Sequence, residues 1–173
     1  MKKFIVIFLL LLISSFATVV YAAGAKWTHP TKIKTYIPPN HKRTTMMKHA
    51  FAEWSLLTKD KIIFVYVKSP DLAQVEVIFV DIIPNADREI GLTKYRYYNS
   101  GKMLEAKIYI AEKTSTGKVL SNDNVYTVML HEIGHAIGLQ HSNDKMSIMY
   151  PAEDDRQEII KSDLAELGKI YGW

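Results

Sequence analysis

The stretch His131–His141, which reads HEIGHAIGLQH, decides the fold of this chain. An α-helix turns about 100° per residue and rises about 1.5 Å, so His131 and His135 lie on one helix face, roughly 6 Å apart along the axis. Two imidazole rings on that face can converge on one metal ion. The stretch therefore predicts a helix that carries a metal site.

The third histidine of the stretch requires this helix to end. On a continued helix His141 would lie about 240° around the axis from His135 and would face away from it. Gly138 can adopt the left-handed conformation of a helix C-terminus without a Cβ penalty. The chain can then return His141 as a third nitrogen ligand. Three protein ligands leave the fourth position of a tetrahedral zinc ion open to water, which is the arrangement of catalytic sites.

Glu132 supplies the other half of the chemistry. It follows the first ligand directly, so its carboxylate can reach a water molecule that zinc activates. Zinc lowers the pKa of water from about 15.7 to near 7. A carboxylate can then take the proton as the water attacks a carbonyl carbon, and later deliver it to the leaving amine. The helical H-E-x-x-H pattern predicts a metalloprotease in its own right, and the longer pattern disfavours the alternative of purely structural roles.

Two motifs resemble a known group of zinc proteases. HEIGHAIGLQH resembles the H-E-x-x-H-x-x-G-x-x-H signature of the metzincins, and Ser147–Pro151 (SIMYP) resembles their Met-turn. Ser142 after the third histidine, and Tyr-Pro after the turn methionine, resemble one branch, the matrixins or matrix metalloproteases. Weaker similarity continues in Ala50–Ser55 (AFAEWS) and at the end of the chain. The resemblance thus covers nearly everything after the first 25 residues.

The resemblance implies a fold, an activity and a set of site residues. The fold is α+β: a twisted, mostly parallel five-stranded sheet with an antiparallel edge strand, an active-site helix, the Met-turn and a C-terminal helix. The activity is that of a zinc metalloendopeptidase with one catalytic zinc ion. The residues that the family pattern assigns are the zinc ligands His131, His135 and His141, the general base Glu132, and Met149 as an apolar floor beneath the metal. The alternative for Met149 is a core methionine, which barely differs because the floor is itself a packing role.

We expect residues 1–25 to be a signal peptide and residues 26–173 to form a single catalytic domain. Lys2 and Lys3 form a positive start, and Phe4–Ile13 is an unbroken apolar run. Ala23–Ala25 (AGA) fits a small-residue cleavage site, and Val20–Ala22 (VYA) fits nearly as well. We therefore expect a secreted protein, extracellular or periplasmic, with no stable membrane association. An uncleaved membrane anchor is the alternative, although the apolar run is short for a span.

Composition narrows the classes of function. The formal charge of +4 loses the two charges of Lys2 and Lys3 with the leader, and the resulting +2 is too small to favour nucleic acid. The chain has no cysteine, which excludes disulfides, thiol catalysis and the cysteine-based latency of many matrixins. We expect a monomer whose partner is a protein or peptide substrate.

Hydrophobic patterns place the helices and strands. Met47, Ala50, Phe51 and Trp54 recur at helical spacing and predict one buried stripe. A strand, this helix and a second apolar strand predict parallel pairing. The predicted strands span 32–37, 62–67, 75–80, 91–98 and 106–110. The predicted helices run from a cap at Thr44 or Thr45 to about Leu57, from a cap at Asp123 or Asn124 through 125–138, and over 162–171.

The substrate pocket is expected beside the metal. The active-site helix would wall it near Thr127 and Val128, and the segment after Pro151 would wall the opposite side. Aromatic residues of the fourth strand can also line the cleft, although packing is the commoner role of aromatic residues in strands. These residues are Tyr95, Tyr97 and Tyr98.

A second zinc ion or a calcium ion, which many matrixins hold after the third strand, is undecided from the sequence. Residues 81–112 contain no histidine. His29, His41 and His49 lack ligand spacing and are expected to be surface or satisfied residues. No specific pattern indicates calcium, and the acidic residues that can support it are Asp81, Asp87 and Glu112.

Two classes of function fit these observations. The first is a secreted zinc endopeptidase in which Glu132 is the base. The second is a non-catalytic zinc-binding module of an envelope or secreted protein that uses the same scaffold for interaction. Such modules typically lose the base, and Glu132 is present.

Overall fold

The computed structural model describes residues 25–84, 89–152 and 157–173. Within them five strands form one sheet: β1 (Ile33–Tyr36), β2 (Phe64–Tyr66), β3 (Val75–Val80), β4 (Gly91–Tyr97) and β5 (Met103–Ala111). The strand order is β2-β1-β3-β5-β4, in which β4 alone runs antiparallel to its neighbour. The predicted α+β fold, a mostly parallel sheet with an antiparallel edge strand, is confirmed.

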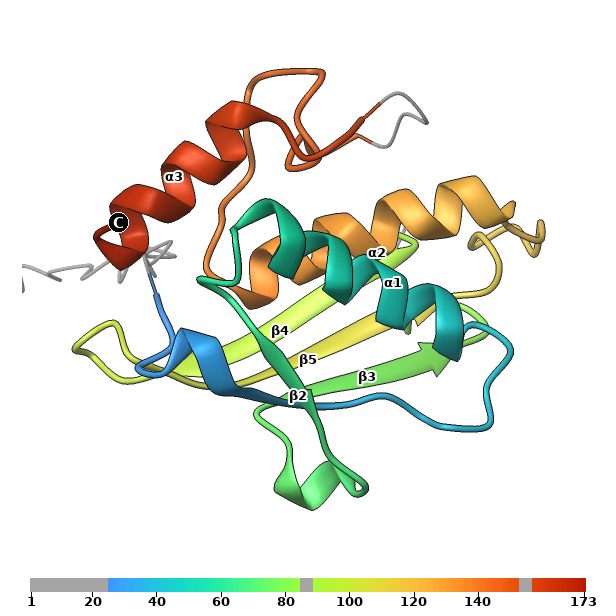
Figure 1. The fold of residues 1–173 in the computed structure, drawn as a ribbon. Helices are drawn as coiled ribbons and strands as arrows, with labels where there is room; N and C mark the ends of the chain where they lie inside the picture. Colours follow the sequence, from blue (N-terminus) through green and yellow to red (C-terminus); the bar gives the residue numbers. More distant parts are fainter. Residues whose placement is uncertain (1–24, 85–88, 153–156) are drawn as a thin grey trace, which may run out of the picture.

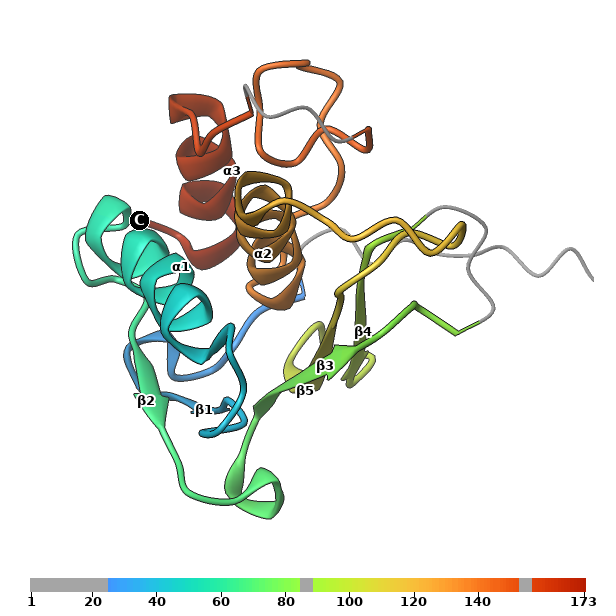
Figure 2. The same ribbon diagram turned by 90° about the vertical axis from the view of Figure 1, so that its right-hand side faces the viewer.

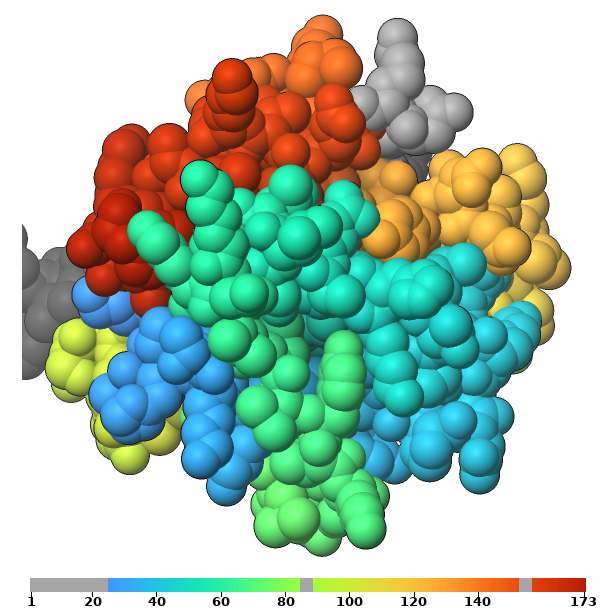
Figure 3. Space-filling view, in the orientation of Figure 1, coloured from blue at the N-terminus to red at the C-terminus, as the bar shows by residue number. Residues whose placement is uncertain are grey.

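Three helices in the described ranges accompany the sheet: α1 (Thr44–Leu57), α2 (Asn122–Ala136) and α3 (Lys161–Tyr171). α1 and α2 lie side by side over one face of the sheet, and α2 also contacts β4 and β5 (Figures 1 and 2). α3 lies beyond them, at the side where the described chain begins (Figure 3). The helix predicted to carry the metal ligands therefore runs beside the antiparallel edge of the sheet.

The predicted stripe on α1 is the centre of the core. Met47, Ala50, Phe51 and Trp54 are all fully buried. Burying each large apolar side chain contributes roughly 1.5–3 kcal/mol. The Trp54 indole N–H also donates a hydrogen bond of 3.0 Å to the Leu130 carbonyl on α2. A buried indole N–H needs a hydrogen-bond partner. Because this partner lies on α2, the bond helps to set the relative position of α1 and α2.

The predicted N-cap residues are wrong at α1 and α2. Ser121 is the N-cap of α2, and its hydroxyl accepts a bond of 3.1 Å from the Asn124 N–H, so α2 begins earlier than predicted. α1 has Arg43 at its N-cap, with no side-chain cap. Thr44 lies in the first turn instead, where its hydroxyl bonds the His41 carbonyl. In both places serine and threonine hydroxyls have several backbone partners within reach, and the tertiary structure decides among them.

The strand boundaries differ mainly in the β4–β5 hairpin. β3 spans the predicted residues, whereas β5 begins at Met103 rather than Ala106. Arg96 and Glu105 are directly paired across the hairpin, with 2.6 Å between Nε and Oε1. Cross-strand ion pairs of this kind stabilise strand pairing, and here the pairing extends β5 back to Met103.

The predicted signal peptide lies outside the described residues except for Ala25. Among the helices of the described ranges, none is long and apolar enough to cross a membrane.

A buried ion cluster ties the start of α1 to the end of β5. The Arg43 guanidinium donates to the Glu112 carboxylate at 3.2 Å and to the Asn122 side chain at 2.6 Å. Lys42 lies 2.6 Å from the same carboxylate. Burial alone would raise the pKa of Glu112, but bonds from Lys42 and Arg43 outweigh it and hold the pKa below its usual value. Glu112 is therefore charged at neutral pH and joined to side-chain cations.

The acidic residues that could support calcium, and His41, have partners of their own in the fold. Asp81 also has a side-chain cation, because Lys113 lies 3.1 Å from its carboxylate. Asp87 lies outside the described residues. His41 stacks on Phe79 with 3.9 Å between ring centroids, as expected of a satisfied residue. Two of the three acidic candidates for calcium thus already have charge partners within the chain.

Replacing Arg43 with Met should lower the free energy of unfolding by about 1–3 kcal/mol, because the buried Glu112 carboxylate loses a charged donor. Urea denaturation at pH 7 measures the change. The matched control is Lys42→Met: the Lys42 side chain is 67% exposed, so its loss should cost less than the loss of the buried guanidinium from the same carboxylate. Equal losses in the two variants would contradict a special role for the buried arginine.

Candidate metal centre and active site

The three predicted ligands converge. His131 and His135 share one face of α2, and His141 returns to them from the loop after the helix. One ring nitrogen from each lies within 4.8 Å of the others. The ring centroids are 4.7, 4.9 and 5.3 Å apart. We call His131, His135 and His141 the histidine cage.

Backbone carbonyls fix the orientation of two rings. His131 Nδ1 lies 2.7 Å from the Ile148 carbonyl oxygen, and His135 Nδ1 lies 2.9 Å from the Leu139 carbonyl oxygen. A carbonyl oxygen only accepts, so each Nδ1 carries the proton and donates it. Each Nε2 is then left with a lone pair for a metal ion.

The spacing and protonation of the histidine cage fit zinc. Two nitrogens bound to one tetrahedral zinc ion at 2.0–2.1 Å lie about 3.3 Å apart, and His135 Nε2 lies 3.3 Å from His141 Nε2. Burial lowers the pKa of His131 to about 4 and that of His135 to about 3. Burial also lowers the pKa of His141. All three rings are therefore neutral at pH 7, as a metal ligand must be.

The helix ends as the sequence predicts. α2 stops at Ala136, and Gly138 has φ +107°, a conformation that side chains rarely adopt. A Cβ at Gly138 would lie only 2.3 Å from the Ala25 carbonyl oxygen. The positive φ of Gly138 therefore requires glycine for the turn, whereas the close approach of Ala25 belongs to the chain before the predicted leader is removed. This turn brings the Leu139 carbonyl under His135 and sends the chain back toward His141.

Aromatic residues from both ends of the described chain donate hydrogen bonds to the carbonyls at the C-terminal end of α2. The Trp27 indole donates to the Ala136 carbonyl at 2.9 Å, and the Tyr171 hydroxyl donates to the Ile137 carbonyl at 3.0 Å. The last carbonyls of a helix have no partner within it. These two bonds satisfy them beside the histidine cage.

Glu132 is buried against β4. Only 5% of its surface is exposed, and the Thr93 hydroxyl lies 2.6 Å from its Oε2 and 3.0 Å from its backbone carbonyl. Sequence reasoning missed Thr93. The signal available was Gly91, because a glycine inside a strand often marks the close approach of another group.

The predicted Met-turn packs directly under α2. Met149 is buried, and a Cβ on Gly134 would meet its sulfur at 2.3 Å. Gly134 precedes His135, so the methionine lies against the part of the helix that carries the ligands. Ser147 ties this turn to α3, since its hydroxyl donates to the buried Asp163 carboxylate at 2.5 Å and accepts from the Met149 N–H at 2.9 Å. The sequence analysis placed Ser147 in the Met-turn motif but did not predict its bond to Asp163.

A hollow of about 550 Å³ opens onto the histidine cage and Glu132. Val128 lines it as predicted, but Thr127 lines a separate hollow between α1 and α2. Adjacent helical residues point about 100° apart, so both could not face the metal. None of the predicted tyrosines lines the hollow, and the Tyr95 hydroxyl instead accepts from Gln140 at 3.3 Å. The other lining residues are Glu89, Ile90, Gly91, Leu92, Thr93, Tyr150, Pro151 and Ala152.

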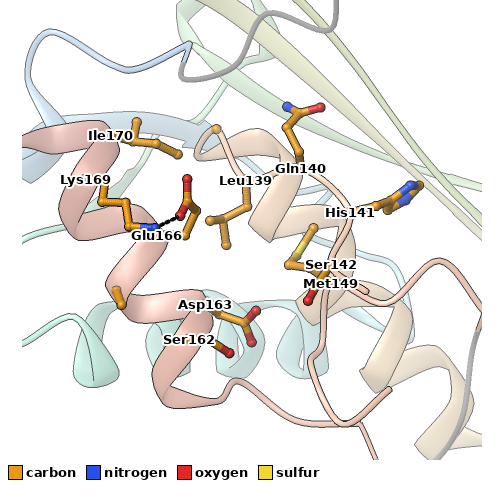
Figure 4. A pocket seen from close by; sticks show the side chains of 12 residues that line it. Leu139, Gln140, His141, Ser142, Met149, Ser162, Asp163, Glu166, Lys169 and Ile170 are labelled. Carbon is orange, nitrogen blue, oxygen red and sulfur yellow. Dashed lines mark hydrogen bonds and ion pairs between the residues drawn. The ribbon is translucent and has the colours of Figure 1, made fainter. Parts of the chain in front are cut away.

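A second hollow lies on the other side of the loop, between residues 138–142 and α3 (Figure 4). Lys169 and Glu166 form an ion pair of 2.7 Å on its α3 wall. His141 and Met149 border this hollow, but Glu132 does not. The three cage histidines and Glu132 therefore come together in the first hollow and not in this one.

Comparison with known proteins gives one consistent result. A family model described as Matrixin matches residues 26–172. Karilysin of Tannerella forsythia is 26% identical over 87% of this chain and 34% of its own length. A putative matrix metalloproteinase of Trichoplusia ni ascovirus 2c is 30% identical over 70% of this chain and 28% of its own length. Matrix metalloproteinase-16 of Homo sapiens is 43% identical over 29% of this chain and 9% of its own length. The chain thus spans about a third or less of these relatives.

Replacing Gly138 with Ala should destabilise the fold by about 1–2 kcal/mol and weaken zinc binding, because the turn that returns His141 is displaced. Competition with a chromophoric chelator measures the zinc affinity. Gly117→Ala is the matched control: Gly117 has φ +83°, but a Cβ there meets nothing within 4 Å. Gly117→Ala should lower the stability through backbone strain but leave the zinc affinity unchanged. Equal zinc affinity in both variants would contradict the role of the Gly138 turn.

Without metal, the protein should lose stability in mild acid. The unfolded chain protonates its histidines below about pH 6.5, whereas folded His131 and His135 stay neutral until about pH 4 and 3. The free energy of unfolding should therefore fall from pH 6.5 to about 4, by up to about 1.4 kcal/mol per pH unit for each ring. Urea unfolding in the presence of a chelator measures the slope. His135→Gln should remove about half of the pH dependence that the two buried histidines contribute. The same dependence of unfolding free energy on pH in His135→Gln and wild type would contradict this explanation.

Proposed function

The chain belongs to the matrixin family, and on this premise we propose that it is a secreted, zinc-dependent endopeptidase that hydrolyses peptide bonds in proteins. The observation that carries the proposal is the meeting of three neutral histidine nitrogens, within 4.8 Å of one another, with a buried carboxylate in one open hollow. A purely structural zinc site would have no reason to place Glu132 there.

The residues divide the chemistry among them. His131, His135 and His141 would hold one zinc ion through ring nitrogens whose tautomers are already set for two of the three rings. Zinc, when bound, supplies a Lewis acid that polarises the scissile carbonyl and makes water more acidic. Glu132 takes a proton from the attacking water at its carboxylate and returns it to the departing amine nitrogen. Met149, packed against Gly134, forms the apolar floor.

The edge of the sheet is the proposed platform for substrate. β4 is the last strand of the described sheet, and its first residues line the hollow. An extended peptide can add to such an edge through backbone hydrogen bonds. Its side chains would then be selected by the wall formed by Val128 on one side and by Tyr150, Pro151 and Ala152 on the other.

The setting follows from the first residues of the sequence. We propose that residues 1–25 direct export and are removed, leaving residues 26–173 as a monomeric catalytic domain outside the cytoplasm. A tethered form that keeps its leader is the alternative. N-terminal sequencing of the exported protein decides between them.

Replacing Glu132 with Gln should lower kcat by at least about 100-fold, because the proton acceptor is lost, while zinc remains bound. Hydrolysis of a quenched peptide library measures turnover, and metal analysis measures zinc. Glu166→Gln is the control, since Glu166 is exposed and pairs with Lys169 on α3. A chelator should abolish wild-type cleavage and added zinc should restore it. Zinc-loaded wild-type protein that cleaves nothing would instead favour the non-catalytic zinc-binding module.

A further inference from the structure

Two residues of β4 form a fitted surface for the Glu132 side chain. Gly91 and Thr93 lie at alternate positions of the strand and therefore project to the same face of the sheet. Both lie against α2 at Glu132. We propose that Thr93 is a positioning residue that holds the Glu132 carboxylate in its reactive orientation, with Gly91 providing the space; this inference rests on the proposed function. We call Gly91 and Thr93 the carboxylate seat.

The Thr93 hydroxyl provides the directional part of the carboxylate seat. It lies 2.6 Å from Glu132 Oε2 and 3.0 Å from the Glu132 backbone oxygen. A hydroxyl has one proton to donate, and the shorter contact, to the charged acceptor, is the stronger of the two. The Thr93 hydroxyl therefore donates its proton to the Glu132 carboxylate and also lies next to the Glu132 backbone carbonyl.

Gly91 provides the space. A Cβ at this position would lie 2.6 Å from Glu132 Oε1, 2.8 Å from Glu132 Cγ and 2.5 Å from Val128 Cγ1. Such distances are too short for any side chain, so a larger residue would push the carboxylate away from the strand. One oxygen of Glu132 is thus bonded by Thr93 while the other lies over the bare backbone of Gly91.

Orientation of this kind should affect turnover more than binding. A glutamate side chain has three rotatable torsions, and fixing them before the reaction removes an entropic cost from the catalytic step. A displacement of about 1 Å in a catalytic group can reduce the rate by about 100-fold. The carboxylate seat touches Glu132 and none of the three cage histidines by hydrogen bond in the described residues, so zinc affinity should be independent of it.

The test compares donor-free and donor-retaining variants of the zinc-loaded protein. Thr93→Val keeps the shape of the side chain and removes the hydroxyl, and Thr93→Ser keeps the hydroxyl. We expect Thr93→Val to lower kcat about tenfold, with KM within about twofold, and Thr93→Ser to stay within about threefold of wild type. Thr35→Val is the matched control, because it removes a buried hydroxyl of the same sheet whose one side-chain bond in the described ranges is to the Ile33 carbonyl.

Two further measurements separate positioning from a general structural effect. Zinc affinity, measured by chelator competition, should be unchanged in Thr93→Val. The double variant Thr93→Val/Glu132→Gln should be no slower than Glu132→Gln alone, because Thr93 acts only through Glu132. Melting temperature reports folding, and if Thr93→Val does not fold, Thr93→Ala is the second donor-free variant, with the same expected loss.

The outcomes are distinct. Wild-type turnover in the donor-free variants, an equal loss in Thr93→Ser, a weakened zinc affinity or additive losses in the double variant would each overturn the carboxylate seat. A zinc-loaded wild-type protein without peptidase activity would overturn the proposed function and the seat with it. Active wild type with unaffected Thr93→Val overturns the seat alone.

Discussion

Two hydrogen bonds from imidazole N–H groups to backbone carbonyls are the constraint on which the rest of the site depends. His131 donates to Ile148 and His135 donates to Leu139. Both acceptors belong to the loop that follows α2, so the orientation of these two rings depends on the conformation of that loop. The bonds select the tautomer and the ring plane together. Neutral rings with inward lone pairs are thus a property of the folded loop, and the turn at Gly138 makes that loop possible.

The rest of the fold supports this loop and the carboxylate opposite it. From one side, the buried Asp163 of α3 holds Ser147, which in turn holds the backbone of Met149. From the other side, Gly91 and Thr93 of the edge strand fit Glu132. The histidine cage and the Glu132 carboxylate therefore receive separate support, from α3 and from the sheet. α2 can thus carry two of the cage histidines and the proposed proton acceptor without the two groups competing for the same contacts.

Local geometry explains how much of this could be predicted from the sequence. The helical period pairs His131 with His135, and the glycine conformation returns His141, so the ligand set required no knowledge of the fold. Thr93 could not be assigned in this way. It lies far along the chain from Glu132 and faces it only because β4 pairs with β5 in a register that puts Thr93 opposite Ile108. Alternation in a strand identifies two faces but does not say which one meets a helix.

The same limit explains the errors. Thr127 and Val128 are neighbours in sequence, yet only Val128 faces the hollow, because the rotation of α2 is set by packing against α1 through Trp54. Ser121, rather than Asp123 or Asn124, is the N-cap of α2 for a comparable reason. Arg43 and Glu112 are brought together from distant segments. In each case the deciding partner comes from another element of the fold.

The two aromatic bonds at the end of α2 have a practical consequence. Trp27 and Tyr171 bond to carbonyls at the end of α2, next to the cage histidines, and both lie near the ends of the described chain. Tags or fusions joined close to Trp27 or Tyr171 would therefore disturb the end of α2 that carries the cage histidines. The short helical loop Pro70–Leu72 lies on the opposite side of the sheet from α3 (Figure 1). Its residues are not buried, so insertions and labels intended to leave the enzyme intact belong there.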